Sequence, residues 1–190
     1  MHLSEKTVLF LGSSVTYGSA SGGISFADIM EKTCGIHYIK EAVSGTTLAD
    51  INDASYVSRL KRVDKSHKVD LFICQLSTND AFADESIHIS DVEKAIRFIL
   101  QYAKNVFQCP IVFYTGTYFE NQRYEDMVKL LYRLQNEYDF YILDLYNDKE
   151  MCRISKDSYQ LYMRDPIHPT LKGYTEWWTP KFIAFCEQLP

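Results

Sequence analysis

Five short apolar segments are spaced along the chain, and each reads as a β-strand. Several are hydrophobic at every position rather than at alternate positions, which is typical of parallel strands covered on both faces. The predicted strands are Thr7–Leu11, His37–Ala42, Val69–Leu76, Ile111–Thr115 and Phe140–Leu145. A sheet of such strands needs helices on both sides.

Between these segments, apolar residues recur at helical spacing. Ser90 and Glu93 form an S-x-x-E capping box, which predicts the start of a helix at Ser90. A second helix is predicted from about Asn121, a weaker one after Gly45 and a last one after Thr170. The buried stripes of the first two helices are predicted to be Val92, Ile96, Ile99, Leu100 and Ala103, and Tyr124, Met127, Val128, Leu131 and Leu134.

The alternation of strands and helices predicts an α/β fold with a mainly parallel sheet and right-handed crossovers. No internal repeat, low-complexity segment or Pro/Gly-rich linker divides the chain, so we expect one domain over residues 1–190. In open α/β sheets, ligands bind beyond the carboxyl ends of the strands. The residues that directly follow each strand are therefore the first candidates for a functional site.

Composition narrows the classes of function. The net charge of −5 argues against a nucleic-acid-binding protein, which normally carries a basic patch. A local group of basic residues is interpreted as a solvated helix end, because acidic residues lie close by. That group consists of Arg59, Lys61, Arg62, Lys65 and Lys68.

The five cysteines are odd in number and include no C-x-x-C pair, so a reduced compartment is expected rather than a disulfide framework. The first apolar run is too short for a signal peptide, and no segment is long enough to span a membrane. We expect a cytoplasmic protein with no membrane partner. No His, Cys or Asp cluster has metal-ligand spacing, and no metal or other cofactor is predicted.

The first predicted strand ends in the turn Gly12-Ser13-Ser14-Val15-Thr16. A serine at a strand-to-helix turn lies near backbone N–H groups that favour developing negative charge, which suits a nucleophile. By itself, a serine here is more often a helix cap. A phosphate-binding loop is a weaker alternative, because neither G-x-x-x-x-G-K-[ST] nor G-x-G-x-x-G is present.

Two further strand ends carry ambiguous residues. Gly45 follows the second strand, where it serves a turn or presents a bare backbone N–H to a reacting centre. Asn79 follows the third strand, where it is a cap or an amide donor to an oxyanion.

The segment Asp165-Pro166-Ile167-His168-Pro169 is the most specific local feature. Its two prolines restrict the backbone, and the D-x-x-H spacing lets the carboxylate reach the imidazole and set its tautomer. An Asx-type turn with an incidental histidine is the alternative. No other histidine has such a partner at a strand end.

Together, these segments resemble the four conserved blocks of the SGNH (GDSL-type) hydrolases, in the same order. The resemblance implies a flavodoxin-like three-layer α/β/α sandwich with a mainly five-stranded parallel sheet. It implies Ser14 as nucleophile, His168 as general base and Asp165 as the residue that orients the base. It also implies an oxyanion hole made by the backbone N–H groups of Ser14 and Gly45 and the side chain of Asn79.

The chain departs from the family pattern at three positions. Ser13 stands where the family usually has Asp, Ser77 where it has Gly, and Pro166 where Gly is common. None of these changes removes a catalytic group. Ser13 is a minor alternative for the nucleophile, because aligning Val15-Thr16 with the family's L-T places Ser14 at the reactive position.

The resemblance implies a serine esterase or acylhydrolase, and we expect a small accessible ester such as a short-chain acyl ester or an O-acetylated carbohydrate. Ser13 and Tyr118 are the candidates for substrate contact, whereas Trp177 or Trp178 is interpreted as packing. An acyltransferase with the same triad, a non-catalytic module and a flavin- or nucleotide-binding domain are the alternatives.

Overall fold

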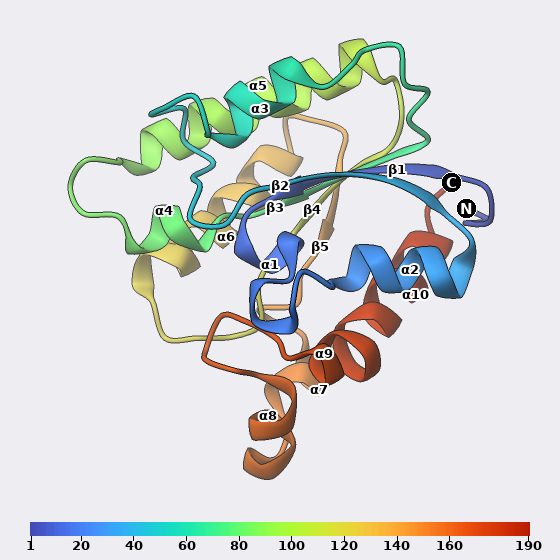
Figure 1. Ribbon diagram of the computed structural model, residues 1–190. Coiled ribbons are helices and arrows are strands. Elements are labelled where there is room, and N and C mark those ends of the chain that lie inside the picture. The colour runs from blue at the N-terminus through green and yellow to red at the C-terminus, as the bar shows by residue number, and fades with distance from the viewer.

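A computed structural model describes residues 1–190 and has a five-stranded sheet at its centre (Figure 1). The strands are β1 (Thr7–Gly12), β2 (His37–Ala42), β3 (Leu71–Gln75), β4 (Ile111–Tyr114) and β5 (Tyr141–Leu143). Their order is β2-β1-β3-β4-β5, and every neighbouring pair is parallel. This is the flavodoxin-like order, in which the winding direction reverses between β1 and β3.

Ten α-helices and two irregular turns complete the structure. The helices are α1 (Ser14–Tyr17), α2 (Phe26–Cys34), α3 (Tyr56–Arg62), α4 (Thr78–Phe82), α5 (Ile89–Val106), α6 (Gln122–Gln135), α7 (Lys149–Cys152), α8 (Lys156–Tyr162), α9 (Leu171–Gly173) and α10 (Thr179–Glu187). A 3₁₀ turn at Ser19–Ser21 and a π-helical turn at Tyr174–Trp178 are also present. No helix combines the length and apolar character needed to cross a membrane.

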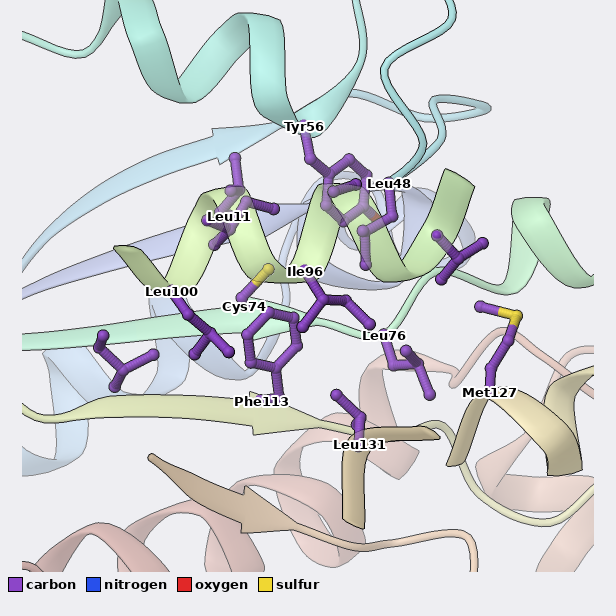
Figure 2. Close-up of a cluster of buried hydrophobic side chains, with 14 of the residues drawn as sticks. Leu11, Leu48, Tyr56, Cys74, Leu76, Ile96, Leu100, Phe113, Met127 and Leu131 are labelled. Carbon is purple, nitrogen blue, oxygen red and sulfur yellow. The ribbon is translucent and has the colours of Figure 1, made fainter. Parts of the chain in front are cut away.

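The strands divide their side chains between two hydrophobic cores, one on each face of the sheet. In β1, Leu9 and Leu11 point into one core, whereas Val8 and Phe10 point into the other. Helices α3, α5 and α6 cover the first core, which Figure 2 shows around Cys74 and Phe113. Helices α2 and α10 cover the second core. Figure 1 shows α3 and α5 on one side of the sheet and α2 and α10 on the other. The predicted three-layer α/β/α fold is therefore confirmed.

All five predicted strands are present, although β3, β4 and β5 are shorter than predicted. The predicted stripe of α5 is buried, but its predicted cap is wrong, because the helix begins at Ile89 instead of after Ser90. The Asp91 carboxylate accepts a hydrogen bond of 3.1 Å from the backbone N–H of His88, and this closes the first turn. Glu93, the predicted acidic member of the capping box, forms ion pairs with Arg97 and Arg133 and does not cap the helix. Asp91 lies at the position from which a carboxylate reaches back to the residue that caps this helix.

Two other expectations change in detail. The helix predicted after Gly45 starts only at Tyr56, and an irregular segment rich in turns precedes it. The last helix is interrupted by the π-helical turn, which adds one residue to the helical repeat. Trp178 at the end of this turn is completely buried, as the packing interpretation predicted.

Candidate active site

The turn after β1 packs tightly against a buried glutamine. Gln75, the last residue of β3, accepts hydrogen bonds from the Ser13 backbone N–H at 2.9 Å and the Thr16 hydroxyl at 2.8 Å. A Cβ atom on Gly12 would lie 1.8 Å from the Thr16 hydroxyl oxygen and 2.8 Å from Gln75 Oε1, so only glycine fits there. The strand thus delivers Ser14 in a fixed position at the first residue of α1.

Ser14 faces a histidine that comes from the far end of the chain. Ser14 Oγ lies 2.8 Å from His168 Nε2, and Ser14 is only 7% exposed. His168 Nδ1 lies 2.8 Å from one carboxylate oxygen of Asp165 and 2.9 Å from the other. A hydroxyl, an imidazole and a carboxylate in this order allow the imidazole to accept the hydroxyl proton.

The Asp165 carboxylate is held by its own loop. One oxygen accepts hydrogen bonds from the backbone N–H groups of Ile167, at 2.8 Å, and His168, at 2.9 Å. Partial burial alone would raise the pKa of Asp165, but these hydrogen bonds and the His168 ring hold the pKa below its ordinary value. The carboxylate is therefore kept ionised and directed at the imidazole. The Tyr174 hydroxyl donates to the Val15 carbonyl at 2.7 Å and ties the C-terminal helices to the serine turn.

Ser13 does not occupy the place that we expected for a substrate contact. It is 0% exposed, and its side chain and backbone N–H both face Gln75. A substrate cannot reach this hydroxyl, so the prediction of Ser13 as a substrate-binding residue is wrong. The same burial and the direction of Ser14 toward His168 argue against Ser13 as the nucleophile.

Gly45 and Asn79 lie together after β2 and β3, the two strands that flank β1. Gly45 has a φ of +78°, a conformation that favours glycine, and its N–H has no partner within the protein. Asn79 Nδ2 donates to the Thr46 carbonyl at 2.8 Å. That bond uses one of the two amide hydrogens and leaves the other free. Both predicted donors are thus placed at the edge of the sheet where Ser14 lies.

A buried arginine links these loops, and the sequence analysis missed it. Arg59 of α3 belongs to the run of basic residues that was interpreted as a solvated helix end, but it is only 5% exposed, so that interpretation is wrong for this residue. The other four residues of the run are exposed. Its guanidinium donates to the carbonyl of Gly12 at 2.7 Å, to that of Glu41 at 2.5 Å and to the Thr46 hydroxyl at 3.2 Å. Arg59 therefore connects the ends of β1 and β2 with the Gly45–Thr46 turn.

Asp80 holds the other side of the same turn. Its two carboxylate oxygens accept from the backbone N–H groups of Leu48 and Ala49, each at 2.8 Å. Burial raises the pKa of Asp80, although these hydrogen bonds favour the charged form. The Ser77 hydroxyl caps α4 by accepting from the Asp80 N–H at 3.4 Å.

Two of the residues that the sequence analysis missed carried a signal. Gln75 is a polar residue at the end of an otherwise apolar strand, and Asp80 directly follows the predicted donor Asn79. Arg59 carried no such signal, because its neighbours on the helix are ordinary solvated cations.

Tyr118, the other residue predicted to contact substrate, is exposed on the loop after β4. Among all residues, no group of three or more His, Cys, Asp or Glu side chains is arranged to hold a metal ion.

Solved structures with the same fold cover almost the whole chain. A protein from Lactobacillus plantarum superposes with a TM-score of 0.78 at 16% identity, with 98% of each chain covered. The native aryl esterase of M. smegmatis gives a TM-score of 0.69 at 16% identity, with 97% of this chain and 98% of that chain covered. A family two carbohydrate esterase from Clostridium thermocellum, in complex with cellohexaose, gives 0.69 at 14% identity and covers 98% of this chain and 66% of that chain.

The TM-scores establish a shared fold, and the family follows from the sequence itself. A search of curated proteins gave no match. The model of the GDSL-like lipase/acylhydrolase family, however, matches residues 10–175 and thus spans the segments that carry Ser14, Asn79 and His168. The chain belongs to the GDSL-like lipase/acylhydrolase family and is a hydrolase that acts on ester bonds.

Proposed function

We propose that this protein is a serine esterase that cleaves small, accessible esters, with Ser14 as nucleophile, His168 as general base and Asp165 as the residue that orients the base. The observation that carries the proposal is the 2.8 Å contact between Ser14 Oγ and His168 Nε2, with Asp165 on the opposite ring nitrogen. This is the geometry by which an imidazole activates a serine hydroxyl. The aryl and carbohydrate esterases that share the fold support ester cleavage as the reaction.

The reaction follows from these three side chains. His168 Nε2 takes the Ser14 proton while Oγ bonds to the ester carbonyl carbon. The C=O bond pair moves to oxygen, and the N–H groups of Ser14 and Gly45 and the Asn79 amide stabilise that negative charge. When the tetrahedral adduct collapses, the bond to the alcohol oxygen breaks and His168 gives it the proton. Water then repeats these steps on the acyl-enzyme, which releases the acid and restores Ser14.

Asp165 supports both proton transfers. The proton on Nδ1 lies between the imidazole and the carboxylate, so Nε2 is left with its lone pair toward Ser14 Oγ. When Nε2 takes up the serine proton, the nearby negative charge stabilises the imidazolium.

A fluorophosphonate probe tests the proposal directly, because it phosphonylates an activated serine and leaves an ordinary one unmodified. We expect peptide mapping to place the modification on Ser14, and His168→Ala to slow it strongly. Assays with p-nitrophenyl acetate and longer acyl analogues then test the substrate size. A folded protein that resists the probe would falsify the serine mechanism, and a strong preference for long acyl chains would contradict a small ester.

Asn79→Ala is expected to lower kcat for p-nitrophenyl acetate by about 10²–10³-fold, because one donor to the oxyanion is lost. The side chain makes one internal hydrogen bond, to the Thr46 carbonyl, so the folded state should persist. Phe82→Ala, an exposed position at the end of the same helix, is the matched control. A change in KM without a change in kcat would show that Asn79 only binds the substrate.

A further inference from the structure

The segment that carries Gly45 has no helix or strand to hold it, because it lies between the end of β2 and the start of α3. Residues 43–45 of this segment are exposed, whereas residues 46–49 are buried. The exposed part includes the Gly45 N–H, one of the donors to the oxyanion in the proposed mechanism. The position of this N–H therefore depends on how the buried part is anchored.

Two neighbouring side chains of α4 anchor the buried part. Asn79 Nδ2 donates to the Thr46 carbonyl at 2.8 Å. One carboxylate oxygen of Asp80 accepts from the Leu48 N–H and the other from the Ala49 N–H, each at 2.8 Å. These bonds attach the segment to the helix that carries the Asn79 amide, which is another donor to the oxyanion. Asp80 therefore holds two of the oxyanion donors relative to each other.

The two bonds from the loop to Asp80 need a charged carboxylate. Asp80 is completely buried and forms no ion pair, and the buried Arg59 has its nearest carboxylate in Glu41. Burying a carboxylate without a cation is costly, and burial raises the pKa of Asp80, although its hydrogen bonds favour the charged form. An asparagine has one acceptor oxygen, so it can serve one of the two N–H groups and turns its NH₂ group to the other. What the buried charge provides is a fixed place for the loop.

We propose that Asp80 is a positioning residue for the oxyanion hole, because it fixes residues 46–49 and thereby keeps the Gly45 N–H beside the Asn79 amide. The inference rests on the proposed function and adds a residue to it. Asp80 acts through the two donors and does not touch the substrate. The oxyanion forms only during the reaction, so loss of this anchor lowers kcat and leaves KM nearly unchanged.

Asp80→Asn tests this role, since it keeps the shape of the side chain and removes one acceptor. Its kcat for p-nitrophenyl acetate is expected to fall about 10–100-fold, because a misplacement of about 1 Å can cost about 10²-fold in rate. KM should stay within about twofold of the native value, since the ground-state complex has no oxyanion.

A transition-state analogue reports on the oxyanion hole itself. Ser14 Oγ adds to the carbonyl carbon of trifluoroacetone, His168 takes the serine proton, and the C=O bond pair moves to the oxygen. That oxygen then occupies the place of the ester oxyanion. The inhibition constant of trifluoroacetone should therefore rise in Asp80→Asn by about the same factor by which kcat falls.

Loss of stability must be separated from loss of positioning, because Asp80 is buried. The value of kcat is therefore expressed per serine that a fluorophosphonate labels after complete reaction, which counts folded sites. Leu100→Ala is the matched control, since it opens a cavity in the hydrophobic core beneath α5. It should lower Tm while kcat per labelled serine stays at the native value.

Amide exchange in the native protein tests the anchor without any variant. Leu48 and Ala49 belong to no helix or strand, and their N–H groups should exchange slowly with deuterium because the Asp80 carboxylate holds them. The N–H of Ser44, in the exposed part of the same segment, should exchange fast.

An unchanged kcat per labelled serine in Asp80→Asn, a rise in KM alone, an unchanged inhibition constant or fast exchange at Leu48 and Ala49 would each overturn the inference. Failure of the proposed function has a different signature. In that case the native protein hydrolyses no ester and is not labelled at Ser14, and the inference falls with it.

Discussion

Replacing Ser14 with alanine is expected to lower kcat for p-nitrophenyl acetate by at least about 10⁴-fold, because no other hydroxyl can take its place as nucleophile. Ser13, the neighbouring hydroxyl, is buried against Gln75 and points away from His168. The residual rate would come from binding and from the oxyanion donors alone.

The same substitution should hardly affect stability. The only side-chain hydrogen bond of Ser14 is the one with His168, which is partly exposed to solvent. Tm should therefore change little, and the loss of activity can be attributed to chemistry. Ser13→Ala is the matched control, and it should keep most of the activity, because its hydroxyl makes only a 3.4 Å contact with Gln75. A Ser14→Ala protein that keeps more than about one hundredth of the activity would contradict the assignment.

Asp165→Asn has the second largest expected effect, a loss of about 10³–10⁴-fold in kcat. In the native protein one carboxylate oxygen accepts the backbone N–H groups of Ile167 and His168. An asparagine would keep its carbonyl oxygen on these donors and turn its NH₂ group toward His168 Nδ1. The imidazole would then carry its proton on Nε2 and could no longer accept the proton of Ser14.

This variant also has a pH signature. The pKa of Asp165 is lowered in the folded state from its ordinary value of 3.8, so the ionised carboxylate stabilises the fold above that value. The contribution is lost as the pH falls through the lowered pKa. The Tm difference between the native protein and Asp165→Asn should thus be constant near neutral pH and shrink in strong acid. A difference that persists in strong acid would mean that the carboxylate charge is not its source.

The elements could be predicted well because their signals are local. Continuous apolar runs mark strands covered on both faces, and the stripe from Val92 to Ala103 marks the buried side of α5. Helix ends were less predictable, since Ser90 matches the capping pattern but the helix is capped at His88, with the Asp91 carboxylate reaching back to it. The candidate catalytic residues could be predicted only in combination. Taken alone, Ser14 would be interpreted as a helix cap. It is predicted to be the nucleophile only together with the segments that carry Asn79 and His168, far along the chain.

The burial of Arg59 and of Ser13 could not be predicted, because it depends on contacts between distant segments. Arg59 has the same local setting as the exposed Arg62, and only the packing of α3 against β1 separates a buried cation from a solvated one. Likewise, Ser13 looked available for a substrate, and only the side chain of Gln75 across the neighbouring strand shows that it is enclosed.

The partners of Arg59 have a consequence for acid tolerance. Its guanidinium is stabilised by hydrogen bonds to the carbonyl oxygens of Gly12, Glu41 and Ala54, whereas the nearest carboxylate oxygen, of Glu41, is 3.9 Å away. Carbonyl groups do not take up protons in the range in which carboxylates do. Acid that protonates Asp165 therefore leaves the hydrogen bonds of Arg59 to these carbonyls in place. Asp80 differs, because burial raises its pKa and its carboxylate on the other side of the Gly45–Thr46 turn loses its charge at a higher pH.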